Sequence, residues 1–110
     1  MPKIGEEGRK RPLCYDPSRE KFIQFDDIIS DRERIISVDS LSEDDLKKLV
    51  IKRWQVLPQD TTVRDLEGKL CTRDEVIQAI ERDEPFGLIV FEGEVSHVRD
   101  LLDDIRRNME

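Results

Sequence analysis

Histidine and cysteine, which often serve as metal ligands or in acid–base and nucleophilic catalysis, are few in this chain and stand far apart. His97 is the only histidine, and Asp100 and Asp104 follow it at intervals that would place the three side chains on one helix face. Asp and Glu make up 26 of the 110 residues, so such spacings arise from composition alone. No glycine-rich phosphate loop, nucleophile elbow or zinc-protease motif accompanies them. We therefore predict no catalytic residue, no metal ligand, no cofactor and no enzymatic activity.

The two cysteines, Cys14 and Cys71, are far apart and neither belongs to a C-x-x-C motif. The sequence also contains no signal-like segment and no apolar stretch of membrane-spanning length. These features predict a cytoplasmic protein with no membrane contact, in which both thiols are reduced and act as small, half-buried hydrophobic residues.

Composition and charge predict a folded domain with a very polar surface. Hydrophobic residues make up 36% of the chain, charged residues 41%, and the net charge is -7. We expect residues 1–11 to form a disordered basic arm and residues 12–110 to form a single small domain. An acidic surface repels phosphate groups, so the residues most able to contact a nucleic acid are those of the arm. They are Lys3, Arg9, Lys10 and Arg11.

The first half of the chain predicts a hairpin, a short helix, a strand and a longer helix. Residues 13–15 and 21–25 are expected to pair across the turn at Asp16-Pro17-Ser18, with a helix or turn opening at residue 26. Residues 34–39 are rich in β-branched side chains and predict a further strand. Ser42, followed by three acidic residues, predicts the start of a helix that Pro58 ends.

A strand or hairpin is expected around Glu67-Gly68, and a second long helix after it. Thr72 with Glu75 three residues later forms a capping-box pattern at the start of this helix. The helix must stop before Pro85, because proline disfavours helical geometry in the residue before it.

Residues 86–110 allow two structures. In the first, residues 88–91 form a buried strand between Gly87 and Gly93, and a helix follows from about residue 96 to residue 107. In the second, one helix carries a heptad seam of Leu88, Phe91, Val95, Val98, Leu102 and Ile105. We favour the first, because a single helix would place Ile89 and Val90 on its polar face and would contain two glycines, which weaken a helix. The predicted fold is therefore α+β, a small and mainly antiparallel sheet with about three helices. The alternative is a mostly helical C-terminal half that forms a coiled-coil dimer.

Apolar side chains near the helix ends are the candidates for contact with a partner. Trp54 follows a basic helix end and could be a core anchor or an aromatic hot spot. The residues predicted to bind a partner are Trp54, Phe91, Val95, Val98 and Leu102.

The stretch YDPSREKFIQFDDI, residues 15–28, resembles the N-terminal domain of the polyhydroxyalkanoate synthesis (PHB accumulation) regulators. That domain's pattern is a Tyr-Asp, a turn, an aromatic-Ile pair, an apolar residue two positions on and an Asp-Ile. The residues that match it here are Tyr15, Asp16, Phe22, Ile23, Phe25, Asp27 and Ile28. The preceding KRPLCYD also resembles the family's basic run before Leu-Tyr-Asp, with Cys14 inserted.

Two later stretches compete for the family's next segment, a strand ending in Asp followed by a turn and an amphipathic helix. One is VDSLSEDDLKKLV with Asp39, Asp44, Asp45 and Leu46, and the other is RDLEGKLCTRDEVIQAI with Asp65, Gly68, Thr72, Arg73, Gln78 and Ile80. The resemblance implies a regulatory domain that binds DNA or associates with granules. Two features argue against direct DNA binding: the surface is acidic, and no predicted helix carries a basic stripe.

Two functions are therefore expected from the sequence. The first is a small regulatory or adaptor protein that acts by binding another protein, whose identity the sequence does not give, or a second copy of itself as a homodimer. The alternative is a DNA-binding transcriptional regulator of the polyhydroxyalkanoate regulator type, although the net charge disfavours nucleic acid.

Overall fold

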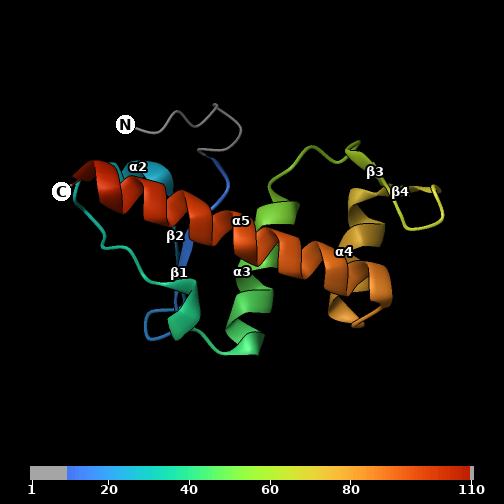
Figure 1. The fold of residues 1–110 in the computed structure, drawn as a ribbon, viewed down its shortest axis with the longest axis horizontal. Coiled ribbons are helices and arrows are strands. Elements are labelled where there is room, and N and C mark those ends of the chain that lie inside the picture. Colours follow the sequence, from blue (N-terminus) through green and yellow to red (C-terminus); the bar gives the residue numbers. More distant parts are fainter. Residues whose placement is uncertain (1–9, 110) are drawn as a thin grey trace.

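The structure is a computed structural model and describes residues 10–109. Within this range it has an α+β fold of two separate antiparallel hairpins, four α-helices and one 3-10 helix (Figure 1). Their order is β1 (Cys14–Asp16), β2 (Lys21–Ile23), α2 (Phe25–Ile29), η1 (Val38–Ser40), α3 (Glu43–Gln55), β3 (Thr62–Arg64), β4 (Leu70–Thr72), α4 (Arg73–Glu81) and α5 (Pro85–Met109). The predicted class is confirmed, but the strands form two hairpins and not one sheet.

The β1–β2 hairpin forms where the sequence predicts it. Tyr15 pairs with Phe22 across the two strands. The carboxylate of Asp16 accepts hydrogen bonds from the backbone N–H and the hydroxyl of Ser18, at 3.0 and 2.7 Å. This local bonding closes the turn, so the hairpin is specified largely by its own residues.

Helices α3 and α4 begin at the predicted caps. The Ser42 hydroxyl accepts from the backbone N–H of Asp45 at 3.2 Å. Thr72 and Glu75 form a reciprocal capping box, in which the Thr72 backbone N–H donates to the Glu75 carboxylate at 3.0 Å. Each cap satisfies N–H groups that a helix start leaves unpaired, which fixes the first turn.

The expected strand at residues 34–39 is wrong. Residues 35–37 have no regular structure, and residues 38–40 form the 3-10 helix η1. The backbone N–H of Ile36 lies 3.4 Å from the Cys14 sulfur, and Val38 is buried in the core. The apolar side chains of this segment are thus covered by tertiary packing, without a partner strand.

The expected strand at residues 88–91 is also wrong, because one helix of 25 residues covers the whole stretch. This helix, α5, is about 37 Å long and crosses the length of the molecule (Figure 1). Val90 and Phe91 pack against the core, whereas Leu88 and Ile89 are exposed. The apolar run is therefore divided between two faces of a helix, and it does not fill one buried strand.

The core has two clusters that lie along α5. The first joins β1, β2, α2 and η1 to the start of α3 and the C-terminal half of α5, and includes Tyr15, Phe25 and Ile105. The second joins the end of α3, β4 and α4 to the N-terminal half of α5, and includes Val76 and Ile80. Val95, near the middle of α5, packs against both clusters.

Candidate functional site

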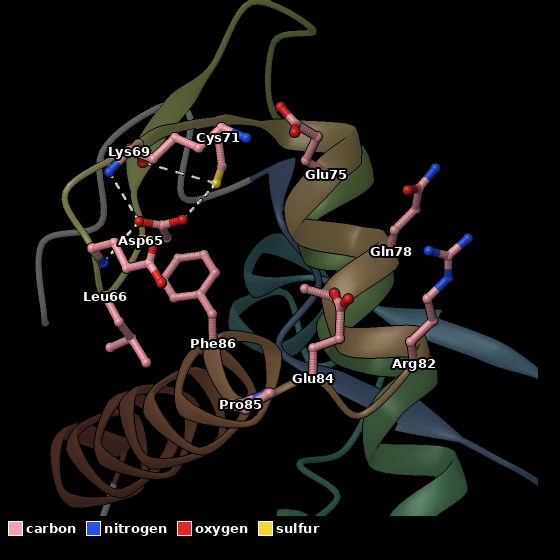
Figure 2. Close-up of a pocket in the computed structure, with 12 residues that line it drawn as sticks. Asp65, Leu66, Lys69, Cys71, Glu75, Gln78, Arg82, Glu84, Pro85 and Phe86 are labelled. Atoms are coloured by element: carbon pink, nitrogen blue, oxygen red, sulfur yellow. Dashed lines mark hydrogen bonds between the residues drawn. The ribbon is translucent and has the colours of Figure 1, made fainter.

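A groove with a volume of about 550 Å³ opens at one end of the molecule, where the β3–β4 hairpin meets the end of α4 and the first turn of α5 (Figure 2). Its lining residues come from these three segments. They are Asp65, Leu66, Glu67, Lys69, Cys71, Glu75, Gln78, Ala79, Arg82, Glu84, Pro85 and Phe86.

The hairpin loop that forms one wall is ordered around the carboxylate of Asp65. This carboxylate accepts from the backbone N–H groups of Glu67 and Lys69, both at 2.9 Å. Gly68 has a φ of 81°, a left-handed conformation that glycine adopts without strain. Because the loop backbone is tied to Asp65, Leu66 projects from a fixed position and is 63% exposed.

Cys71 lies on the inner side of the hairpin, with its sulfur 3.8 Å from a carboxylate oxygen of Asp65 (Figure 2). Burial and the negative charge of Asp65 raise the pKa of the Cys71 thiol. The other cysteine, Cys14, is buried in the first cluster, and burial raises its pKa to about 11. Both thiols are protonated at neutral pH, which removes the thiolate that a nucleophilic cysteine needs.

Helix α4 forms the opposite wall with a row of polar side chains. Figure 2 shows Glu75 and Gln78 along this helix and Arg82 just after its last residue. A hydrogen bond from the Thr72 backbone lowers the pKa of Glu75, so this carboxylate is ionised at neutral pH. The groove therefore has a polar side on α4 and an apolar side formed by Leu66, Pro85 and Phe86.

The predicted partner-binding residues lie mainly inside this chain's own core. Val98 and Leu102 are buried in the first cluster, and Trp54 is 7% exposed in the second. Phe91 and Val95 are half-buried against the core. From Phe91 to Ile105 the heptad seam of α5 therefore packs within the chain, whereas Leu88 at its start is exposed.

The four residues predicted to contact nucleic acid differ in their exposure and in whether the structure describes them. Lys3 and Arg9 lie outside the described residues, and Lys10 is exposed. Arg11 is half-buried and forms an ion pair with Glu94 at 2.8 Å. Of the described members of the arm, only Lys10 is thus open to a phosphate.

Glu94 belongs to a charged trio, with half-buried Arg11 and buried Arg53, that sequence inspection did not find. The Arg53 guanidinium is 2% exposed and donates to the Glu94 carboxylate and to the Pro12 carbonyl, both at 2.8 Å. Arg11 donates to the other Glu94 oxygen and to the Arg53 carbonyl. Burial alone would raise the pKa of Glu94, but the two arginines outweigh burial and lower it. The trio joins the segment before β1 to α3 and α5.

His97 is exposed on α5, and within residues 10–109 no group of three or more His, Cys, Asp or Glu side chains is placed to hold a metal ion. Asp104 pairs with Arg107 on the same helix. In the described part of the chain, no helix combines the length and the apolar character needed to cross a membrane.

The geometry thus defines an α+β chain with a charged, partly apolar groove beside the β3–β4 hairpin. No protein-family model, curated protein or solved structure matches this chain. Local sequence contains a signal for the groove, since Leu66 places a large apolar residue beside a Glu-Gly turn, where polar residues are usual.

Proposed function

We propose that this chain is a small, non-enzymatic adaptor or regulatory protein of the cytoplasm that binds another protein through the groove. The observation that supports this is the placement of exposed apolar residues. Among the described residues, every large exposed hydrophobic side chain falls between positions 56 and 89. They are Val56, Leu66, Leu70, Leu88 and Ile89. One of them, Leu66, lines the groove beside Pro85 and Phe86, and an exposed apolar side chain at a concave site is typical of a protein contact.

The groove is the natural centre of such a contact. Binding energy in protein interfaces is concentrated in a few large side chains that fill pockets. A volume of about 550 Å³ is enough to accept one or two such side chains from a partner. Phe86 supplies a half-buried aromatic surface in the groove, and Leu66 supplies an exposed apolar one from the hairpin loop.

The test is site-specific cross-linking with a matched control on the same hairpin. A photo-reactive residue is placed at Leu66, which lines the groove, or at Leu70, which is exposed on the outer side because strand residues alternate. In host cells, we expect a discrete adduct from position 66 and none from position 70. With the purified partner, Leu66→Asp should weaken binding about tenfold or more, equivalent to about 1.4 kcal/mol. Equal adducts from both positions, or none from position 66, would refute the proposal.

Two lysines on α3, exposed Lys48 and half-buried Lys52, support DNA binding as a second candidate, which also agrees with the resemblance to polyhydroxyalkanoate regulators. Lys48 and Lys52 lie one turn apart on α3, each 5.8 Å from the centre of an aromatic ring of the β1–β2 hairpin, Tyr15 and Phe22 respectively. A DNA contact there should weaken steeply with salt and on Lys48→Gln with Lys52→Gln. Absence of DNA retention at low salt would exclude it.

A homodimer is the third arrangement to be tested. Because Val98 and Leu102 pack inside the chain, we propose that any contact between two copies uses the exposed first turns of α5, with Leu88 and Ile89. Light scattering during size exclusion gives the mass directly, and Ile89→Asp should convert a dimer into a monomer.

A further inference from the structure

We infer that the segment bound in the groove is a basic peptide that presents an apolar side chain between lysine or arginine residues. This inference rests on the proposed function, because it names the chemistry of the partner for the same groove. Three properties of the lining carry it: the excess of carboxylates, the way these carboxylates are hydrogen-bonded, and the position of the apolar residues.

The lining residues carry more negative than positive charge. Four are carboxylates and two are cations, the latter being Lys69 and Arg82. The carboxylates are Asp65, Glu67, Glu75 and Glu84. The groove thus has a net charge of about -2 within a chain whose net charge is -7.

The two carboxylates that order the groove form hydrogen bonds but no ion pair with any residue in the range 10–109. Asp65 accepts hydrogen bonds from backbone N–H groups of its own loop and from the Cys71 thiol. Glu75 accepts from the Thr72 backbone N–H. These donors are neutral, so each carboxylate keeps its charge and its field extends into the groove.

Glu67 and Glu84 form no ion pair with any described residue, and both are exposed at the edge of the groove. Cations on a partner can therefore approach them without first breaking a bond within the chain. Arg82 likewise forms no ion pair with a described residue, and its charge repels basic residues of a partner. The electrostatic attraction is therefore strongest when these basic residues lie near Glu67 and Glu84 and away from Arg82.

The apolar contacts fix where the partner's apolar side chain lies. Leu66, Pro85 and Phe86 line the side opposite to the row on α4 (Figure 2). A peptide lying between the two sides meets Leu66, Pro85 and Phe86 on one side, with Glu67 and Glu84 beside them. On the other side it meets the polar side chains of α4. The exposed Gln78 amide on α4 can donate to and accept from a peptide backbone. A polyanion such as nucleic acid is repelled by the same field.

The experiment is a selection of random displayed peptides on the full chain, with Leu66→Asp protein as the counter-selection target. We expect the recovered peptides to be enriched in lysine and arginine beside an aliphatic or aromatic residue. A recovered peptide should bind less tightly as salt increases. Glu67→Lys and Glu84→Lys should each weaken its binding about two- to fivefold, the size of an exposed charge contact. Glu92→Lys, on the exposed face of α5 outside the groove lining, is the matched control and should change binding less.

The outcomes separate the partner chemistry from the proposed function. Peptides that require Leu66 but show no excess of basic residues, or that are acidic, would overturn the inference and leave binding at the groove standing. If no recovered peptide depends on Leu66, both the inference and the groove as a binding site fail.

Discussion

The two glycines of α5 allow a sharp test of this fold, because the same substitution is expected to act with opposite sign at positions 87 and 93. Gly87 lies where α5 crosses α4. A Cβ atom at this position would be 2.1 Å from the carbonyl oxygen of Ala79 and 2.6 Å from the backbone nitrogen of Ile80. Gly93 has no such neighbour, since a Cβ atom there would meet nothing within 4 Å.

The magnitudes follow from these distances. The atoms that Gly87→Ala would meet belong to the backbone of α4, so the two helices must move apart to admit the methyl group. Overpacking of this kind costs about 1–3 kcal/mol. At Gly93 only the helix propensity changes, which favours alanine over glycine by about 0.8–1.0 kcal/mol. The propensity gain is common to both helical positions and cancels between them, so the two variants should differ by roughly the overpacking cost, about 1–3 kcal/mol in the free energy of unfolding.

Urea unfolding followed by circular dichroism measures this difference. Gly87→Ala should lower the midpoint and Gly93→Ala should raise it, with similar slopes for both transitions. If Gly87→Ala were as stable as the parent, α4 and α5 could not cross at this distance. If Gly93→Ala were destabilising, residue 93 could not lie in the open middle of a continuous helix.

Three further predictions concern charge and capping. Glu94→Ala should cost about 3–5 kcal/mol in urea unfolding, because Arg53 would remain buried without its counter-ion; a loss below about 1 kcal/mol would show that water reaches Arg53. Thr72→Ala should cost about 1 kcal/mol through loss of the helix cap, measured in the same way, and an unchanged midpoint would contradict the capping box. Hydrogen bonds from Ser18 and Arg19 lower the pKa of Asp16 from its ordinary value of 3.8 to about 2. Hydrogen bonds from Arg19 and Lys21 lower the pKa of Glu33 from 4.5 to about 2. The unfolded chain therefore binds more protons in acid, so stability should fall as the pH decreases from about 4.5 to about 2, and Glu33→Gln should make this fall shallower.

Elements that depend on local bonds could be predicted from the sequence. The caps at Ser42 and Thr72, the turn at Asp16 and the glycine turn at Gly68 each need only residues within three or four positions. Local hydrogen bonds of this kind stabilise a turn or a helix cap without contacts to distant residues. For this reason the starts of α3 and α4 and the two hairpins lie where they were expected.

The segments whose structure was predicted wrongly depend on contacts between distant residues. Residues 88–91 have a strand-like composition, but the approach of Gly87 to Ala79 holds the start of α5 against α4. Residues 34–39 are β-branched, yet Val38 packs into the core as part of a short 3-10 helix. Strand propensity describes how a side chain fits a half-buried surface, and either type of element can supply such a surface.

The groove could not be predicted because no short stretch contains it. Leu66 on the hairpin loop and Phe86 at the start of α5 are twenty positions apart, and only the turn between α4 and α5 brings them into one lining. The heptad seam of α5, in contrast, is visible in the sequence but suggested a contact with another chain. Its spacing correctly marks one apolar helix face, but spacing cannot distinguish a face that meets another chain from one that meets the same chain.

The charged trio of Arg11, Arg53 and Glu94 explains how a groove at one end of the molecule can have a fixed shape. Both of its walls depend on the second cluster, which α3 and α5 connect to the first. Arg53 lies on α3 and Glu94 on α5, and their ion pair is formed where the two clusters meet near Val95. A buried ion pair adds little net stability compared with apolar packing, but its bonds are satisfied in one arrangement of the two helices and are costly to leave unpaired. Arg53 and Glu94 therefore restrict how α5 can slide along α3, and through α5 they hold Pro85 and Phe86 in place beside the hairpin.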